Sequence, residues 1–183
     1  LNLSSYIGDN SDHSKFKPGV RLGVGMEYQF TDIISLQPSL FFSQKGAKYS
    51  EGYKGIVDAD ADVKINQLYL ELPINVQFRF NIANNTNLVV ATGPYLACGV
   101  GGKAKFDGEA SIGNVDINAD EKIDTFGDDG LGYNRFDAGW NIGLGVEFGQ
   151  ILVGLDTQLG FCKIMDGNAP HNANIGITVG YKF

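Results

Sequence analysis

The last twelve residues of the chain alternate between apolar and polar side chains. One parity is wholly apolar or aromatic: Ala173, Ile175, Ile177, Val179, Tyr181 and Phe183. The other parity, from Asn172 to Lys182, is polar or glycine. A period of two is typical of an extended strand with one face in an apolar medium. Because an unpaired edge strand is a liability, the segment favours a closed sheet in which this strand has partners on both sides.

The same alternation returns along the whole chain. Five further apolar rows run over residues 20–30, 34–42, 68–80, 136–148 and 151–161. Residues 1–7 form a shorter row, and residues 88–103 form a strand of ambiguous parity. In that last strand we expect Leu96 and Val100 to face outward, Tyr95 and Ala97 to face inward, and an interruption at 93–94. The pattern therefore predicts eight strands.

One proline falls inside a predicted strand. Pro38 lies in the row 34–42, and proline cannot donate a ladder hydrogen bond. We therefore expect a β-bulge at this position.

The connections between the predicted strands alternate in length. Long connections fall near 8–18, 51–64, 105–134 and 165–171, with turns of a few residues between them. Outer-membrane β-barrels have short periplasmic turns, longer extracellular loops and an even number of strands. We therefore predict an all-β fold in which residues 1–183 form one domain, an eight-stranded antiparallel up-and-down transmembrane β-barrel.

Aromatic residues gather at the short-turn ends of the apolar rows. They form a predicted girdle: Tyr28, Phe30, Phe78, Phe80, Phe148, Tyr181 and Phe183. Outer-membrane barrels carry such girdles on the lipid-facing side. The placement predicts that the apolar rows face lipid.

The polar parity indicates what lies inside the barrel. It is rich in glycine, Asn, Gln and Ser, with isolated charges of both signs. A packed polar lumen is expected from these residues, because an eight-stranded barrel is just wide enough for side chains to fill it. The predicted lumen network is Arg21, Glu27, Glu71, Arg79, Asn141, Glu147, Asp156 and Lys182. The alternative is a soluble lipocalin-like barrel, whose apolar face would point inward around a ligand.

Composition limits the functions that fit the chain. The formal net charge of −7 over 183 residues argues against nucleic-acid binding. No apolar run reaches the length of a membrane helix, and no signal-peptide pattern opens the sequence. We therefore expect a mature product whose signal peptide has been removed. Cys98 and Cys162 fall on non-adjacent predicted strands with opposite parity, so we expect two unpaired cysteines.

No group of residues forms a convincing catalytic or metal-binding motif. His13 and His171 both fall in predicted loops, without a nucleophile-elbow pattern nearby, so no catalytic residues and no cofactor are expected. A weak calcium candidate is Asp116, Asn118 and Asp120. The spacing matches the start of an EF-hand loop, but Glu121 and Gly127 stand where that motif needs glycine and a bidentate acid. We expect a solvated acidic loop instead.

Several short segments, in order, resemble a known family. They are LNLSSYIG, PGVRLGVGMEYQF, LQPSLFFSQKGAKY, YLELPINVQFRF, GPYLACGVGGK and GITVGYKF. The series is similar to the PorT-like outer-membrane β-barrel family of Bacteroidetes and covers nearly the whole chain outside the long loops. The resemblance implies an eight-stranded barrel in the outer membrane of a Gram-negative bacterium. Some relatives are linked to protein secretion, but the resemblance implies no shared activity.

Three functional classes remain open at this point. The first is a structural or interaction barrel that presents its loops outside the cell, the second a narrow channel or carrier of small hydrophobic ligands, and the third an outer-membrane enzyme. The lack of a catalytic constellation disfavours the third. The expected partners are outer-membrane lipid, the barrel-assembly machinery through the C-terminal strand, and an extracellular protein or ligand through the loops. The acidic loop 105–134 should favour cationic partners.

Overall fold

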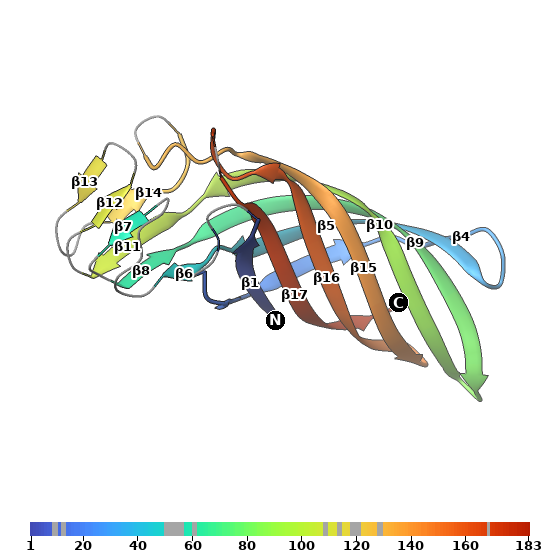
Figure 1. Ribbon diagram of the computed structural model, residues 1–183. Helices are drawn as coiled ribbons and strands as arrows, with labels where there is room; N and C mark the ends of the chain where they lie inside the picture. The colour runs from blue at the N-terminus through green and yellow to red at the C-terminus, as the bar shows by residue number, and fades with distance from the viewer. Residues whose placement is uncertain are drawn as a thin grey trace.

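The protein is an all-β chain whose antiparallel strands form a strongly curled sheet (Figure 1). The computed structural model describes residues 1–8, 11, 14–49, 57–59, 62–107, 110–112, 115–117, 122–127, 130–167 and 169–183. Among these residues, no helix is long and apolar enough to cross a membrane.

The main sheet follows one continuous path of neighbouring strands. In order, these are β2 (Lys17–Gly19), β1 (Asn2–Ile7), β17 (His171–Tyr181), β16 (Ile151–Lys163), β15 (Phe136–Phe148), β10 (Thr86–Gly101), β9 (Gln67–Ala83), β5 (Ile34–Lys45) and β3 (Arg21–Gly25), and β4 (Tyr28–Gln29) also pairs with β5. The two ends of this path, β2 and β3, are separated in the chain by Val20 alone. The carbonyl of Val20 accepts a hydrogen bond of 2.9 Å from the amide of Gln44. The sheet therefore curls until its two ends meet in one chain segment.

The two ends of the curled sheet differ. The hairpins β9–β10 and β15–β16 lie at the end near the C-terminus, here named the short-turn end (Figure 1). The opposite end, named the loop end, carries two smaller sheets. One consists of β14 (Lys122–Asp124), β11 (Lys103–Asp107), β8 (Asp62–Ile65) and β6 (Lys48–Tyr49). The other consists of β13 (Val115–Ile117), β12 (Ala110–Ile112) and β7 (Val57–Ala59).

The four-stranded sheet extends the main sheet beyond a short break. β6, β8 and β11 continue β5, β9 and β10, and they keep the same neighbours. The chain steps between the sheets at Gly46, Asn66 and Gly102, and both glycines have positive φ, at 131° and 154°. A Cβ atom at Gly46 would collide with the Ile65 carbonyl, and one at Gly102 with the Asn66 carbonyl. Glycine is needed at both positions because the neighbouring backbones approach so closely.

The inward and outward faces of β10 match the predicted parity. Tyr95 and Ala97 are buried, whereas Leu96 and Val100 are exposed. The strand itself is not interrupted at 93–94, because β10 runs unbroken from Thr86 to Gly101 and pairs with β15 through both residues. Its pairing with β9 does lapse there, between Thr92↔Val76 and Tyr95↔Pro73. At this point Gly93 lies so close to β9 that a Cβ atom would collide with the β9 backbone.

The predicted bulge at Pro38 is also wrong. The β5–β9 register is unchanged from Pro38↔Ile74 to Phe41↔Glu71. On the other side, Met26 donates to the Pro38 carbonyl at 3.0 Å, while proline has no N–H to donate back. The strand opposite divides there into β3 and β4 without a change of register. The missing N–H of Pro38 therefore interrupts the neighbouring strand, between β3 and β4, and produces no bulge in β5.

The ranges predicted as long connections contain strands. β2 begins within 8–18, β8 lies mostly within 51–64, β12 to β14 lie within 105–134, and β17 begins at His171. Within the longest of these ranges, β12 and β13 form an antiparallel pair. These strands are short and separated by turn residues, so the sequence pattern did not show that they continue the main strands.

Candidate functional site

Four charged side chains form a cluster inside the short-turn end. Arg79 on β9 lies against Glu147 on β15, with Nε–Oε1 at 3.1 Å and Nη2–Oε2 at 3.0 Å. Its Nη1 is 2.7 Å from Glu27 Oε1, and Lys182 Nζ is 2.8 Å from Glu27 Oε2. The side chains of Arg79, Glu27 and Glu147 are largely buried, whereas that of Lys182 is 48% exposed. Two carboxylates thus share two cations, one of them at the water-exposed rim.

A second charged cluster surrounds Glu71 in the middle of the barrel. The Glu71 side chain is 0% exposed and accepts from Arg21 Nε at 3.1 Å and Gln158 Nε2 at 3.3 Å. Lys45 Nζ, on a side chain 1% exposed, lies 2.7 Å from the other carboxylate oxygen. Arg21 also contacts Asp156 at 3.1 Å and lies over the ring of Phe41. Burial without these partners would be very costly for the carboxylate.

Asp137 extends this cluster toward the loop end. Its carboxylate accepts hydrogen bonds of 3.1 Å from Tyr95 Oη and from Asn172 Nδ2. Lys45 Nζ lies 3.8 Å from the same carboxylate. The interior on this side is therefore a connected network of charges and neutral donors.

Polar amides line the space between the two charged clusters. Asn141 Nδ2 donates to Asn75 Oδ1 at 3.3 Å, and Gln77 donates to Gln37 at 2.7 Å. A cavity of about 100 Å³ lies beside them. Its volume is enough for several water molecules. Arg21 and Asp156 of the central cluster also line this cavity.

An aromatic cap fills the interior at the loop end. We define this cap as the buried side chains Tyr6, Tyr49, Tyr69, Tyr95, Phe126 and Tyr133. The ring of Phe126 meets that of Tyr69 edge-on at 5.5 Å. Lys45 lies 4.6 Å from the Tyr95 ring, so the cap rests on the Glu71 cluster. Burial raises the pKa of Tyr133 above the ordinary value for a tyrosine.

Gly99 on β10 makes room for the cap, and its replacement gives a testable prediction. A Cβ there would lie 2.5 Å from the Phe126 ring, whereas a Cβ at Gly101 would meet nothing within 4 Å. We expect Gly99→Ala to destabilise the folded barrel by about 1–3 kcal/mol, the usual range for overpacking. Gly101→Ala should have little effect. Urea unfolding in lipid vesicles measures both, and equal effects would contradict the packing of Phe126 on Gly99.

The predicted lumen residues fall into three places. Arg21, Glu71 and Asp156 are together in the central cluster, and Glu27, Arg79, Glu147 and Lys182 are together at the short-turn end. Asn141 lies between them. Sequence reasoning missed Lys45 and Asp137. Both continue the polar parity of their strands, and Lys45 was overlooked because the predicted strand stopped before β5 ends.

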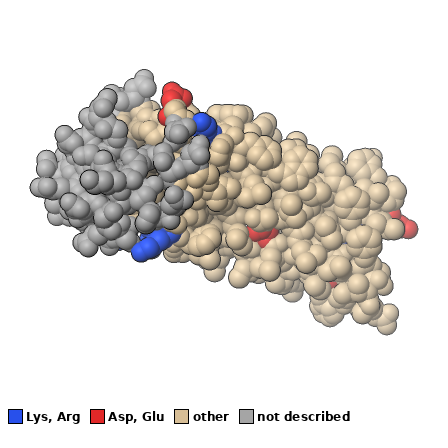
Figure 2. All heavy atoms as spheres, in the orientation of Figure 1, with Lys and Arg blue, Asp and Glu red and all other residues tan. Residues whose placement is uncertain are grey.

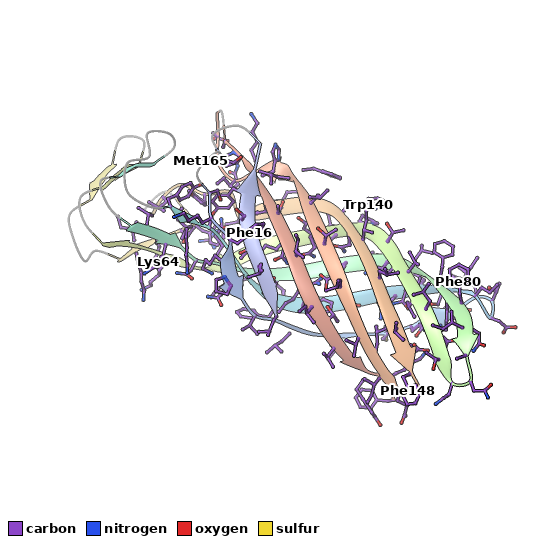
Figure 3. All side chains as sticks on the ribbon, turned by 60° about the horizontal axis from the view of Figure 1, so that its bottom comes forward. Phe16, Lys64, Phe80, Trp140, Phe148 and Met165 are labelled. Atoms are coloured by element: carbon purple, nitrogen blue, oxygen red, sulfur yellow. The ribbon has the colours of Figure 1, made fainter. Side chains whose placement is uncertain are left out.

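The predicted girdle residues occupy the short-turn end. Tyr28, Phe30, Phe80, Phe148, Tyr181 and Phe183 are exposed, and Phe78 is half-buried. Phe80 and Phe148 lie at the same end of the barrel in Figure 3. Their rings are therefore presented outward around one rim.

The remaining candidate chemistry gathers into no site within the described residues. Asn118 and Asp120 of the calcium candidate lie outside the described residues, and so does His13. Of Asp116, which lies on β13, only the backbone is described. His171 begins β17. Both cysteines are free, and Cys98 is exposed.

Comparison with known proteins identifies the kind of domain. A family model described as "Outer membrane protein beta-barrel domain" matches residues 2–166. Among solved structures, the chain is similar to Ail, the attachment invasion locus protein of Yersinia pestis. The sequences are 16% identical, the TM-score is 0.45, and the match covers 100% of this chain and 93% of that one. No curated protein matches the sequence.

Proposed function

This chain belongs to the outer membrane protein β-barrel domain family, and we propose that it is a closed, side-chain-filled barrel that acts as a structural and interaction module. It is a small outer-membrane β-barrel protein, placed by its family in the Gram-negative outer membrane. The observation that carries the proposal is the filled interior, because it leaves the loop end as the surface available to partners.

The strand topology supports a barrel of eight membrane passes. β2, β3 and β4 are pieces of one segment, residues 17–29, that pairs with β1 at one end and with β5 at the other. Counting this segment once reduces the ten-stranded sheet to eight passes. Even strand numbers are the rule in bacterial barrels.

The burial pattern supports a lipid-facing wall. Large apolar side chains are exposed on every long strand, among them Val24, Leu40, Leu72, Leu96, Leu144, Leu155 and Ile177. Polar side chains of the opposite parity are buried, as Ser35, Gln77 and Gln158 illustrate. A lipocalin-like barrel would have the reverse arrangement. An apolar surface of this extent is suited to lipid and not to water.

The interior favours a structural role over transport. Among the described residues, the aromatic cap, the Glu71 cluster and the Arg79 cluster fill the barrel at successive levels, and this filling supports a structural role over a water channel or a hydrophobic-ligand site. We therefore regard a narrow channel or carrier as the second candidate. A PorT-like or secretion-associated role is a further proposal, and it rests on the sequence resemblance alone.

The loop end is the proposed recognition surface, with an extracellular protein or ligand as its partner. The barrel wall is committed to lipid, and β17, as the C-terminal strand, is the proposed signal for the assembly machinery. The segment 105–134 carries eight acidic residues and two lysines, a balance that favours cationic partners.

Shortening the longest loop tests this role. Phe126 packs in the cap, so we would replace only residues 108–121 with a short Gly-Ser linker. The variant should insert into vesicles like the wild type, because the cap and both charged clusters stay intact, and it should lose binding to cells or cationic proteins. Retention of every binding phenotype would contradict the proposed role of the loop. Failure of the wild type to insert would contradict the proposed barrel itself.

A further inference from the structure

Four lysines stand in one row across neighbouring strands at the loop end. Cross-strand pairing places Lys105 opposite Lys64, Lys64 opposite Lys48, and Lys48 opposite Lys15. Directly paired residues share one face of a sheet. The register therefore puts all four on the same face and at the same level.

This lysine row is on the outer face of the barrel. Lys15, Lys64 and Lys105 are exposed and Lys48 is half-exposed, while their strand neighbours Val63 and Ala104 are buried. Lys64 lies at the loop end, opposite Phe80 and Phe148 (Figure 3). In the face shown in Figure 2, basic side chains appear at the border between the barrel wall and the loop end. The row is therefore open to the surroundings of the barrel and not to its interior.

The row begins where the apolar wall ends. Among the described side chains, the outermost exposed apolar ones on the same four segments are Phe16, Phe42, Leu70 and Val100. Each lies within six residues of the lysine on its segment. If the wall is in lipid, the lysines are at the level of the outer-leaflet head groups.

Like charges placed directly opposite each other across strands are unfavourable, so a row of paired lysines gains from an anionic counterpart. Lys15 and Lys64 also interact with other groups of the protein. The lysine row repeats one positive charge at the membrane boundary, and it is therefore the favourable place for an external anion.

We propose that the lysine row binds the phosphates of an outer-leaflet glycolipid, the phosphorylated lipid A of lipopolysaccharide, while its acyl chains lie on the apolar wall below. Charge complementarity and position both select this ligand. A soluble polyanion would have to reach the head-group level from the aqueous phase, whereas a membrane lipid reaches the row from its own leaflet. The proposal rests on the membrane-spanning role proposed above.

Native mass spectrometry of the full chain in neutral detergent tests the proposal. The probes are diphosphoryl lipid A and the same lipid after dephosphorylation. Each lysine near an anionic lipid surface contributes roughly fivefold in affinity. The wild type should therefore prefer the phosphorylated lipid by about tenfold or more. The variant Lys48→Gln, Lys64→Gln, Lys105→Gln should lose this preference, and the corresponding triple arginine variant should keep it.

Lys163→Gln is the matched control. Lys163 is an exposed lysine at the same end, but on β16, away from the row. It should bind both lipids like the wild type. The proposal is overturned if the wild type shows no phosphate preference, if the triple glutamine variant keeps it, or if the control loses it equally. If the triple variant does not fold, Lys105→Gln alone should weaken binding roughly fivefold, and no loss would again overturn the proposal. If the wild type inserts into vesicles but shows no preference for the phosphorylated lipid, the lysine site is contradicted and the barrel proposal is unaffected.

Discussion

Replacing Glu71 by alanine should destabilise the folded barrel by about 3–5 kcal/mol, the usual cost of removing one partner from a buried ion pair. The Glu71 side chain has no exposed surface, and its carboxylate pairs with the buried ammonium of Lys45. It is also one of the two carboxylates that pair with Arg21. Without it, the one carboxylate left near Lys45 among the described residues is the more distant Asp137, at 3.8 Å. Urea unfolding in lipid vesicles measures the change. Trp140, the single tryptophan, lies exposed on the outer face and reports the transition by fluorescence.

A double variant separates charge burial from packing. Lys45→Met with Glu71→Leu removes both charges and keeps most of the volume, while Arg21 retains Asp156. Replacing a buried pair by apolar groups is often close to neutral, so the double variant should be more stable than Glu71→Ala. If the double variant loses as much unfolding free energy as Lys45→Met and Glu71→Leu lose separately when added together, the two side chains are not energetically coupled.

Replacing Arg79 by alanine should have the second-largest effect. Arg79 binds Glu27 and Glu147 from one guanidinium. Among the described residues, its loss leaves these two largely buried carboxylates with Lys182 as their one cation, beside the Asn87 amide that donates to Glu147 at 3.1 Å. We expect a loss of about 3 kcal/mol, the lower end of the range for a broken buried pair, because this cluster lies at the rim of the barrel. The same vesicle unfolding experiment measures it.

Lys182→Ala is the control for Arg79→Ala. Lys182 contacts the same two carboxylates, but its side chain is 48% exposed. Exposed ion pairs contribute about 0–1 kcal/mol, so this variant should be only slightly destabilised. Equal losses from both variants would show that burial does not set the strength of this cluster.

The alternation of side chains was sufficient to predict the long strands and their inner and outer faces. The exposed row of β9 and the inward Tyr95 of β10 both follow from a period of two. The errors arose where a rule for one strand was applied without considering the strand that pairs with it. Pro38 was expected to distort its own strand, but its missing N–H instead interrupts the paired strand, between β3 and β4. Gly93 permits a close contact with β9 that the sequence does not reveal.

The interior was only partly predictable for a different reason. Parity identifies which charges face inward, but not which of them meet. Glu71 contacts Arg21 from 50 residues away, and it contacts Lys45 at the end of β5, beyond the predicted row 34–42. The aromatic cap depends on Phe126 and Tyr133 returning from the longest connection to pack against β9 and β10. Such contacts arise from tertiary structure, and no local pattern encodes them.

Single-channel recording in planar lipid bilayers is the most direct test of a barrel closed by its own side chains. The folded protein would be inserted at neutral pH, and protease protection of the barrel strands in the same preparation would establish that it spans the membrane. We expect inserted protein with no stable conductance level, because the aromatic cap and the two charged clusters close the lumen at three levels. A stable single-channel conductance from inserted wild-type protein would contradict this closed barrel.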